Sequence, residues 1–246
     1  MTTVLRLRRA AAGEFVKLAR TRSLTWTLAA GVLLAALSAL VGGMVGQSDG
    51  SLTSRDVLPL GAAVALPFAT AFGVMVFAGE VRHGTLTVLL AAEPRRAVVV
   101  AAKTVPALLG GALMGAAAAA LSGGAVQVTL GDVPGALFAR VLWGSAAAGA
   151  FLALFGLGLA ALVRNQGAAL FVALGYQFAG EELLRFGVRR EVADLAERLP
   201  ITLANGLAMG DPLPDARGIA VAILAAWSLG TVVVGTLAFA RRDALP

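Results

Sequence analysis

Side chains that could carry acid–base, nucleophilic or metal chemistry are scarce in this chain. Its 246 residues include no cysteine and a single histidine, which excludes disulfides, thiolate metal sites and thiol catalysis. His83 has no partner for an H-E-x-x-H zinc motif, and a lone loop histidine is typical of a solvated group. Neither Lys17 nor Lys103 follows the glycine spacing of a phosphate-binding P-loop. We therefore expect no enzyme activity, metal or cofactor in this chain itself.

The remaining polar candidates lie within or beside apolar stretches. Glu181 and Glu182 end a short apolar run, where carboxylates are more typical of a membrane boundary than of an acid–base pair. Gln127, Tyr176 and Gln177 are uncharged, and we interpret them as polar contacts for a molecule crossing the membrane. The apolar runs otherwise contain no ionisable group, whereas ion-coupled carriers normally keep such groups at mid-membrane.

The helices that position these side chains must lie in an apolar solvent. Hydrophobic residues make up 59% of the chain and charged residues only 14%, with a mean hydropathy of +0.85. Soluble domains are about 45–50% apolar and about 25% charged, and a helix needs roughly 20 apolar residues to cross a membrane. The runs that meet or approach this length are Leu24–Gly46, Val57–Ala78, Thr104–Val126, Val141–Val163, Gly167–Leu184 and Gly218–Ala240. The sequence therefore predicts an all-α polytopic membrane protein with six transmembrane helices, of which the fifth is the shortest.

The distribution of charge predicts the orientation of these helices. With the N-terminus in the cytoplasm, thirteen Lys and Arg residues lie inside and seven outside, whereas four acidic residues lie inside and ten outside. This arrangement obeys the positive-inside rule and puts both termini in the cytoplasm. The net charge of +6 lies at the ends of apolar runs rather than in a basic stripe with aromatics, so we expect no nucleic-acid partner. High Ala, Gly, Val and Arg usage indicates a GC-rich bacterial source, and we therefore expect the membrane to be a bacterial plasma membrane.

The segments between the runs also carry patterns. The first 23 residues alternate so that Phe15 and Leu18 share one helical face and Lys17 and Arg20 the opposite one, which predicts a helix on the inner membrane surface. In the loop 79–103, charges bracket a short apolar patch, Thr85–Ala92, that is too short to span and should lie at the interface or against a partner. Between the fifth and sixth runs, residues 185–217 predict an extracellular surface helix up to Pro200 and then a short, partly dipping segment.

Three stretches, in this order, resemble the permease subunits of type-2 ABC transporters, which export drugs, lipids and polysaccharides. They are Gly13–Leu28 (GEFVKLARTRSLTWTL), Glu80–Lys103 with its Gly-Thr-Leu and Pro-Arg-Arg sequences, and Leu199–Leu207 (LPITLANGL). The terminal Ala240–Asp243 is similar to many members as well, and with the six runs the resemblance covers nearly the whole chain. It implies a single permease domain over residues 1–246, with a cytoplasmic tail from residue 241.

The resemblance also implies a division of labour between subunits. The loop after the second span would form a coupling helix in a groove of a separate cytoplasmic ATPase, which binds Mg-ATP. ATP-driven closure of two such ATPases would push two permease subunits between inward and outward states. The residues implied in this coupling are Glu80, Arg82, His83, Gly84, Thr85, Pro94, Arg95 and Arg96, with His83 standing where a larger charged or polar residue is common. The helix that braces the ATPase at the membrane would include Phe15, Lys17, Arg20 and Arg22.

Two other functions are compatible with the same residues. One is a membrane scaffold or sensor that holds a partner without moving a substrate. The other is an ion-coupled carrier, which the uncharged runs disfavour. For an exporter, the apolar interior favours a hydrophobic or amphipathic substrate.

Overall fold

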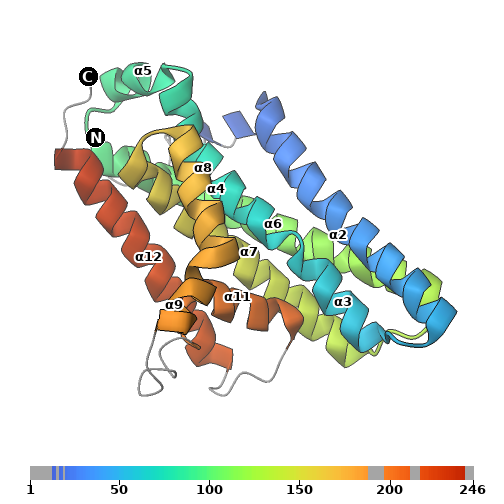
Figure 1. Ribbon diagram of the computed structural model, residues 1–246. Coiled ribbons are helices and arrows are strands. Elements are labelled where there is room, and N and C mark those ends of the chain that lie inside the picture. Colours follow the sequence, from blue (N-terminus) through green and yellow to red (C-terminus); the bar gives the residue numbers. More distant parts are fainter. Residues whose placement is uncertain (1–12, 15–16, 19, 188–196, 211–216, 242–246) are drawn as a thin grey trace.

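The computed structural model describes residues 13–14, 17–18, 20–187, 197–210 and 217–241, and every regular element among them is helical (Figure 1). The elements are α2 (Arg22–Asp49), α3 (Ser54–Ala63), α4 (Leu66–Arg82), α5 (Thr85–Ala92), α6 (Arg96–Leu130), α7 (Gly135–Val163), α8 (Gln166–Gly175), the π-helical turn η1 (Tyr176–Gly180), α9 (Glu181–Gly187), α11 (Pro200–Met209) and α12 (Arg217–Arg241). In Figure 1, α5 stands at one end of the elongated molecule and α9 and α11 at the opposite end. We call these the α5 end and the α11 end.

Five helical runs within the described residues are long and apolar enough to cross a membrane. They are Arg22–Asp49, Ser54–Arg82, Arg96–Leu130, Gly135–Val163 and Gly218–Arg241. This confirms that the chain is an all-helical, multi-pass membrane protein, and each of the five contains most or all of one predicted run. The run Ser54–Arg82 consists of α3 and α4, because the chain makes a turn at Val64 and Ala65 and the helix restarts at Leu66, with Pro67 in the first turn of α4.

The fifth predicted span, Gly167–Leu184, is not among the helical runs that are apolar enough to cross a membrane. Residues 166–187 form a continuous helical run made of α8, η1 and α9. Its second half carries Gln177, Glu181 and Glu182, which make it less apolar than the other runs, and its hydrogen bonding shifts to the π pattern at Tyr176–Gly180. Among the described residues, five helical runs are therefore long and apolar enough to cross a membrane, and the sixth crossing stays a prediction.

Helix α7 forms the centre of the bundle. Of its most apolar stretch 67% is buried, against 22% for α2 and 28% for α12, which lie at the periphery. Its approach to α6 depends on glycine, since a Cβ atom added at Gly111 or Gly115 would collide with the backbone oxygen of Gly149 or Ser145. Small residues that let helix backbones come this close are the usual basis of helix association in lipid.

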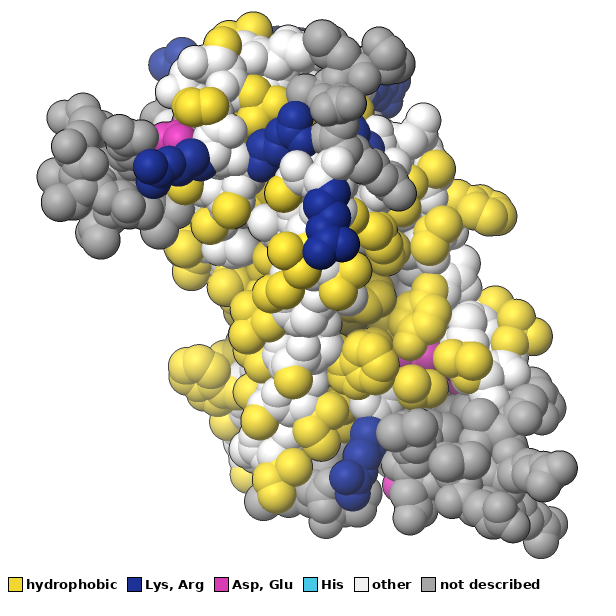
Figure 2. Space-filling view, turned by 90° about the vertical axis from the view of Figure 1, so that its left-hand side faces the viewer, with side chains coloured by type: hydrophobic (Ala, Val, Ile, Leu, Met, Phe, Trp, Pro, Cys, Tyr) yellow, Lys and Arg dark blue, Asp and Glu magenta, His cyan; other side chains and the backbone are white. Residues whose placement is uncertain are grey.

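The surface between the two ends is apolar, as a membrane requires. Figure 2 shows hydrophobic side chains over the middle of one face, with Lys and Arg side chains gathered mainly toward the α5 end. Large apolar side chains on α2, such as Leu33 and Met44, are more than half exposed, as are Leu113 on α6 and Val233 on α12. In water such a surface would drive aggregation, whereas lipid tails cover it without cost.

Candidate functional site

The loop after α4 folds as a short helix that stands apart from the bundle. Gly84 has a left-handed backbone (φ 68°) and turns the chain between α4 and α5, a conformation that favours glycine. Only Leu86 of α5 is buried, and it packs into the main core, whereas Val88 is 70% exposed. The predicted patch Thr85–Ala92 coincides with α5. The helix therefore has one anchoring side chain and an apolar, mostly uncovered outer surface.

Two lysines and two glutamates form a buried ion cluster beside this loop. Lys103 Nζ lies 2.7 Å from Glu14 Oε2 and 2.9 Å from Glu80 Oε1, and Lys17 Nζ lies 2.9 Å from Glu14 Oε1 and 2.8 Å from Glu80 Oε1. The Lys103 side chain is fully buried, and the side chains of Glu14 and Glu80 are 7% and 12% exposed. A buried charge is tolerated only when it is paired. The cluster thus joins three elements: the N-terminal helical segment, α4 and α6.

The remaining groups of the cluster differ in their surroundings. Glu80 Oε2 is buried and accepts no hydrogen bond from the described residues. Lys17 is half exposed; burial lowers its pKa, but hydrogen bonds with Glu80 and Glu14 outweigh this and raise the pKa above its usual range. Lys17 therefore stays charged at any physiological pH.

The ion cluster corrects the predicted limits of the loop. We expected Lys103 at the end of a cytoplasmic loop, but α6 begins at Arg96 and places Lys103 about two turns inside the helix. The loop is accordingly limited to residues 83–95. Sequence reasoning assigned no role to Glu14, although a fully buried lysine requires a carboxylate. A usable signal was available, because Glu14 and Glu80 are two of only four acidic residues on the predicted inner side.

The predicted coupling arginines separate into two environments. Arg96 donates from Nη1 to the backbone oxygen of Phe239 at 2.8 Å, and its guanidinium lies 5.4 Å from the centre of the Phe239 ring. Arg164 lies over the same ring at 5.7 Å, and Phe77 meets it edge-on. Arg96 thus caps the C-terminal end of α12, where a cation is favourable. Arg95 is exposed, and so are Arg82, His83 and Pro94.

The N-terminal candidates are only partly described. Lys17 and Arg20 have helical backbone, and Arg22 begins α2. Phe15 lies outside the described residues, so its predicted place on the apolar face is untested. The predicted surface helix ending at Leu199 also lies largely outside them, since residues 188–196 are not described.

Two of the three predicted pathway residues lie together, and the third lies apart. Gln177 and Tyr176 are both in η1; the hydroxyl of Thr70 on α4 donates to Gln177 Oε1 at 2.7 Å, and Tyr176 packs against Phe155 of α7. Gln127 is exposed near the end of α6, and its side chain donates to the backbone oxygen of Gly131 at 3.0 Å. The Gln127 side chain therefore pairs with a backbone oxygen at the C-terminal end of its own helix.

At the α11 end, Glu181 has a structural contact that the boundary interpretation did not include. Its carboxylate accepts hydrogen bonds from the backbone N–H groups of Ile201 and Thr202 at 2.6 and 2.8 Å and from the Thr202 hydroxyl at 2.7 Å. These groups form the first turn of α11, whose unpaired N–H groups favour an anion. Pro200 occupies the first position of α11, and the helix that we expected to end before it lies largely outside the described residues.

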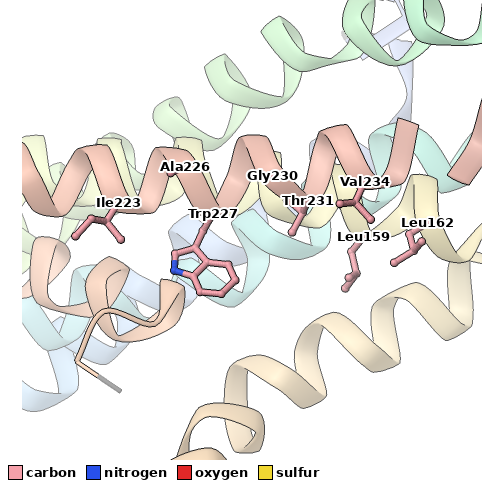
Figure 3. A pocket seen from close by; sticks show the side chains of 9 residues that line it. Leu159, Leu162, Ile223, Ala226, Trp227, Gly230, Thr231 and Val234 are labelled. Atoms are coloured by element: carbon pink, nitrogen blue, oxygen red, sulfur yellow. The ribbon is translucent and has the colours of Figure 1, made fainter. Parts of the chain in front are cut away.

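Two recesses complete the candidate sites. A cleft of ≈ 730 Å³ at the α5 end is lined by residues of the N-terminal segment, α2 and α4 and by members of the ion cluster. An apolar groove of ≈ 480 Å³ lies between α7 and α12, and Figure 3 shows Trp227 on α12 and Leu159 on α7 along it. No three His, Asp or Glu side chains gather as a metal site among the described residues.

Comparison with known proteins assigns no family, since neither a protein-family model nor a curated protein matches the chain. The functional assignment therefore depends on the geometry of the α5 end.

Proposed function

We propose that the chain is the permease subunit of an ATP-driven ABC exporter in a bacterial plasma membrane. In this proposal residues 166–187 also cross the membrane, as the fifth of six crossings in chain order. Both termini and α5 then lie in the cytoplasm. The chain forms half of a transmembrane pathway together with a second permease subunit. A separate ATPase subunit supplies the energy, because the chain contains no P-loop.

The observation that supports this proposal is the exposure of α5 together with its connections to α4 and α6. Its outer surface is mostly uncovered, and Gly84 and Pro94 bound it on the two sides. Through α4 and α6 it is connected to Glu80 and Lys103 of the ion cluster, so a force applied to α5 reaches two membrane helices and the N-terminal segment together. A partner that moves α5 can therefore move the bundle, which is what coupling to an ATPase requires.

The coupling experiment uses the chain together with an ABC-class ATPase encoded beside it. We expect the two to copurify, and we expect Glu80→Ala or deletion of Gly84 and Thr85 to uncouple ATP hydrolysis from transport. Arg55→Ala, an exposed arginine at the α11 end, is the matched control and should leave coupling unchanged. If the two proteins do not copurify and the loop substitutions have no effect on ATP hydrolysis or transport, the scaffold function would explain the chain better. Transport that needs a proton gradient and no ATP would favour the carrier.

Cysteine labelling tests the topology, and the chain has no native cysteine that would give background labelling. Single cysteines at Asn165 and Glu197 lie on the two sides of the run 166–187. In intact cells, a membrane-impermeant thiol reagent should label Glu197→Cys and spare Asn165→Cys, while a cysteine at Thr87 of α5 is also spared. Labelling of both Asn165→Cys and Glu197→Cys from outside would mean that residues 166–187 do not cross the membrane.

A further inference from the structure

The cleft at the α5 end contains two arginines that the ion cluster does not use. Arg20, from the N-terminal segment, and Arg82, from the end of α4, both line the cleft and are exposed. Neither guanidinium forms an ion pair with any residue that the structure describes. The two cations therefore face a shared recess in which no carboxylate of the described residues pairs with them.

The acidic groups near the cleft are already neutralised. Glu14 and Glu80 each contact both Lys17 and Lys103, so the four charges of the cluster cancel. Among the described lining residues, the residual charge is then that of the two arginines, with His83 as a further basic side chain of the lining, which makes the cleft electropositive. Other donors at the cleft include the Ser23 hydroxyl.

The inner wall of the cleft is apolar and continues into membrane-crossing helices. Leu24 on α2 and Met75 and Val76 on α4 line it, and each lies within a run that is apolar enough to span a membrane. The cleft thus combines a cationic mouth with an apolar wall. Its volume of ≈ 730 Å³ falls within the range typical of small-ligand sites, roughly 300–1,000 Å³.

We propose that this cleft binds the head group of an anionic phospholipid. The phosphate lies at Arg20 and Arg82, and the first carbons of an acyl chain lie against Leu24 and Met75. Anionic lipids are abundant in the cytoplasmic leaflet and are attracted to arginines beside the membrane. The lipid would also link the N-terminal segment to α4 from the outside, next to the ion cluster. The inference goes beyond transport; it rests on the cytoplasmic position of the α5 end in the proposed function, but not on an ATPase docking at α5.

The test measures lipid preference of the purified full chain in phosphatidylcholine nanodiscs. Trace spin-labelled phosphatidylglycerol reports protein-bound lipid through its immobilised spectral component, and spin-labelled phosphatidylcholine is the reference. Arg20→Gln/Arg82→Gln is compared with the matched control Arg95→Gln/Arg241→Gln, which removes the same charge at the same end but outside the cleft. Each arginine beside an anionic lipid contributes roughly a fivefold factor, so we expect a loss of roughly 25-fold for the cleft pair. The control pair should retain most of the preference.

Three results would overturn the proposal. One is an equal loss in both double variants, which would indicate diffuse attraction to a basic surface. Another is an unchanged preference in the cleft variant. The third is displacement of the label by soluble glycerol 3-phosphate, which would assign the site to a soluble phosphate compound instead. Thermal unfolding of both variants verifies folding, and native mass spectrometry of the wild-type chain, which should retain phosphatidylglycerol over phosphatidylcholine, gives an independent measurement.

Discussion

Replacing Glu14 with glutamine tests whether the buried ion cluster holds the N-terminal segment to the bundle. The substitution leaves Lys103 fully buried with one carboxylate instead of two. Removing one partner of a buried ion pair typically costs about 3–5 kcal/mol, because an uncompensated charge stays in a medium of low dielectric constant. Since Glu80 still contacts Lys103 at 2.9 Å, we expect the lower end of that range, about 3 kcal/mol.

The double-mutant cycle is the decisive part of this experiment. Lys103→Met should cost a similar amount, about 3 kcal/mol, since it leaves two carboxylates to share Lys17. In Glu14→Gln/Lys103→Met the pair between Lys17 and Glu80, at 2.8 Å, remains intact and neutral. The double variant should therefore cost no more than either single change, which corresponds to a coupling free energy of about 3 kcal/mol.

The assay is unfolding of the full chain in mixed micelles of increasing SDS content, followed by the fluorescence of its three tryptophans. Lys17→Met is the matched control, because it removes a lysine with the same two partners but a side chain that is 49% exposed. Solvent screens the charge of Lys17, and Lys103 keeps its contacts with both carboxylates, so this loss should cost less than that of Lys103→Met, although it too leaves one carboxylate charge in excess. Additive single costs, or a Lys17→Met cost equal to that of Lys103→Met, would refute the argument that burial makes the cluster strong.

Three further substitutions have expected outcomes in the same unfolding assay. Gly84→Ala should lower the free energy of unfolding by about 1–2 kcal/mol, because alanine disfavours the left-handed backbone there. It should also reduce coupling to a docked ATPase. An unchanged midpoint of the unfolding transition would argue against the left-handed turn at Gly84. Gly149→Leu should cost at least about 2 kcal/mol by forcing α6 and α7 apart, whereas Gly124→Leu, at an open position on α6, should be tolerated. Glu181→Ala should cost about 2–3 kcal/mol through the lost cap of α11, and the exposed Glu182→Ala less than about 1 kcal/mol; equal costs would contradict the capping role.

The sequence was a good guide wherever lipid decides the structure. Runs of apolar residues predicted five helices correctly, since a membrane-crossing segment has to satisfy its backbone internally and can only be a helix or part of a closed barrel. The apolar patch Thr85–Ala92 likewise predicted α5, because charges and Pro94 delimit it. Both signals are local in the sequence, so they can be recognised without knowing which residues pack against these segments in the fold.

The sequence was a poor guide wherever a distant partner decides. Gly111 and Gly115 are two of 30 glycines, and nothing local distinguishes them from Gly124, where an added Cβ atom would meet no other atom within 4 Å. Lys103 follows apolar residues, as a loop lysine before a span would, and its burial depends on two carboxylates that the fold brings to it, those of Glu14, 89 positions away, and of Glu80 on α4. Glu181 similarly finds the start of α11 across 20 positions.

The positions of Glu14 and Glu181 suggest how the two ends of the bundle can differ in mobility. At the α11 end, Glu181 fixes a short helix by hydrogen bonds to its backbone, which cannot be exchanged for other donors without unfolding the turn. At the α5 end, Glu14 and Glu80 share two ammonium groups with several donor hydrogens each, so their bonds can rearrange while the charges stay paired. Glu80 Oε2, buried and without a hydrogen bond from the described residues, gives that rearrangement an acceptor. The proposed coupling through α5 would need this property, since a cluster with only one arrangement would resist the motion that the proposal has it transmit.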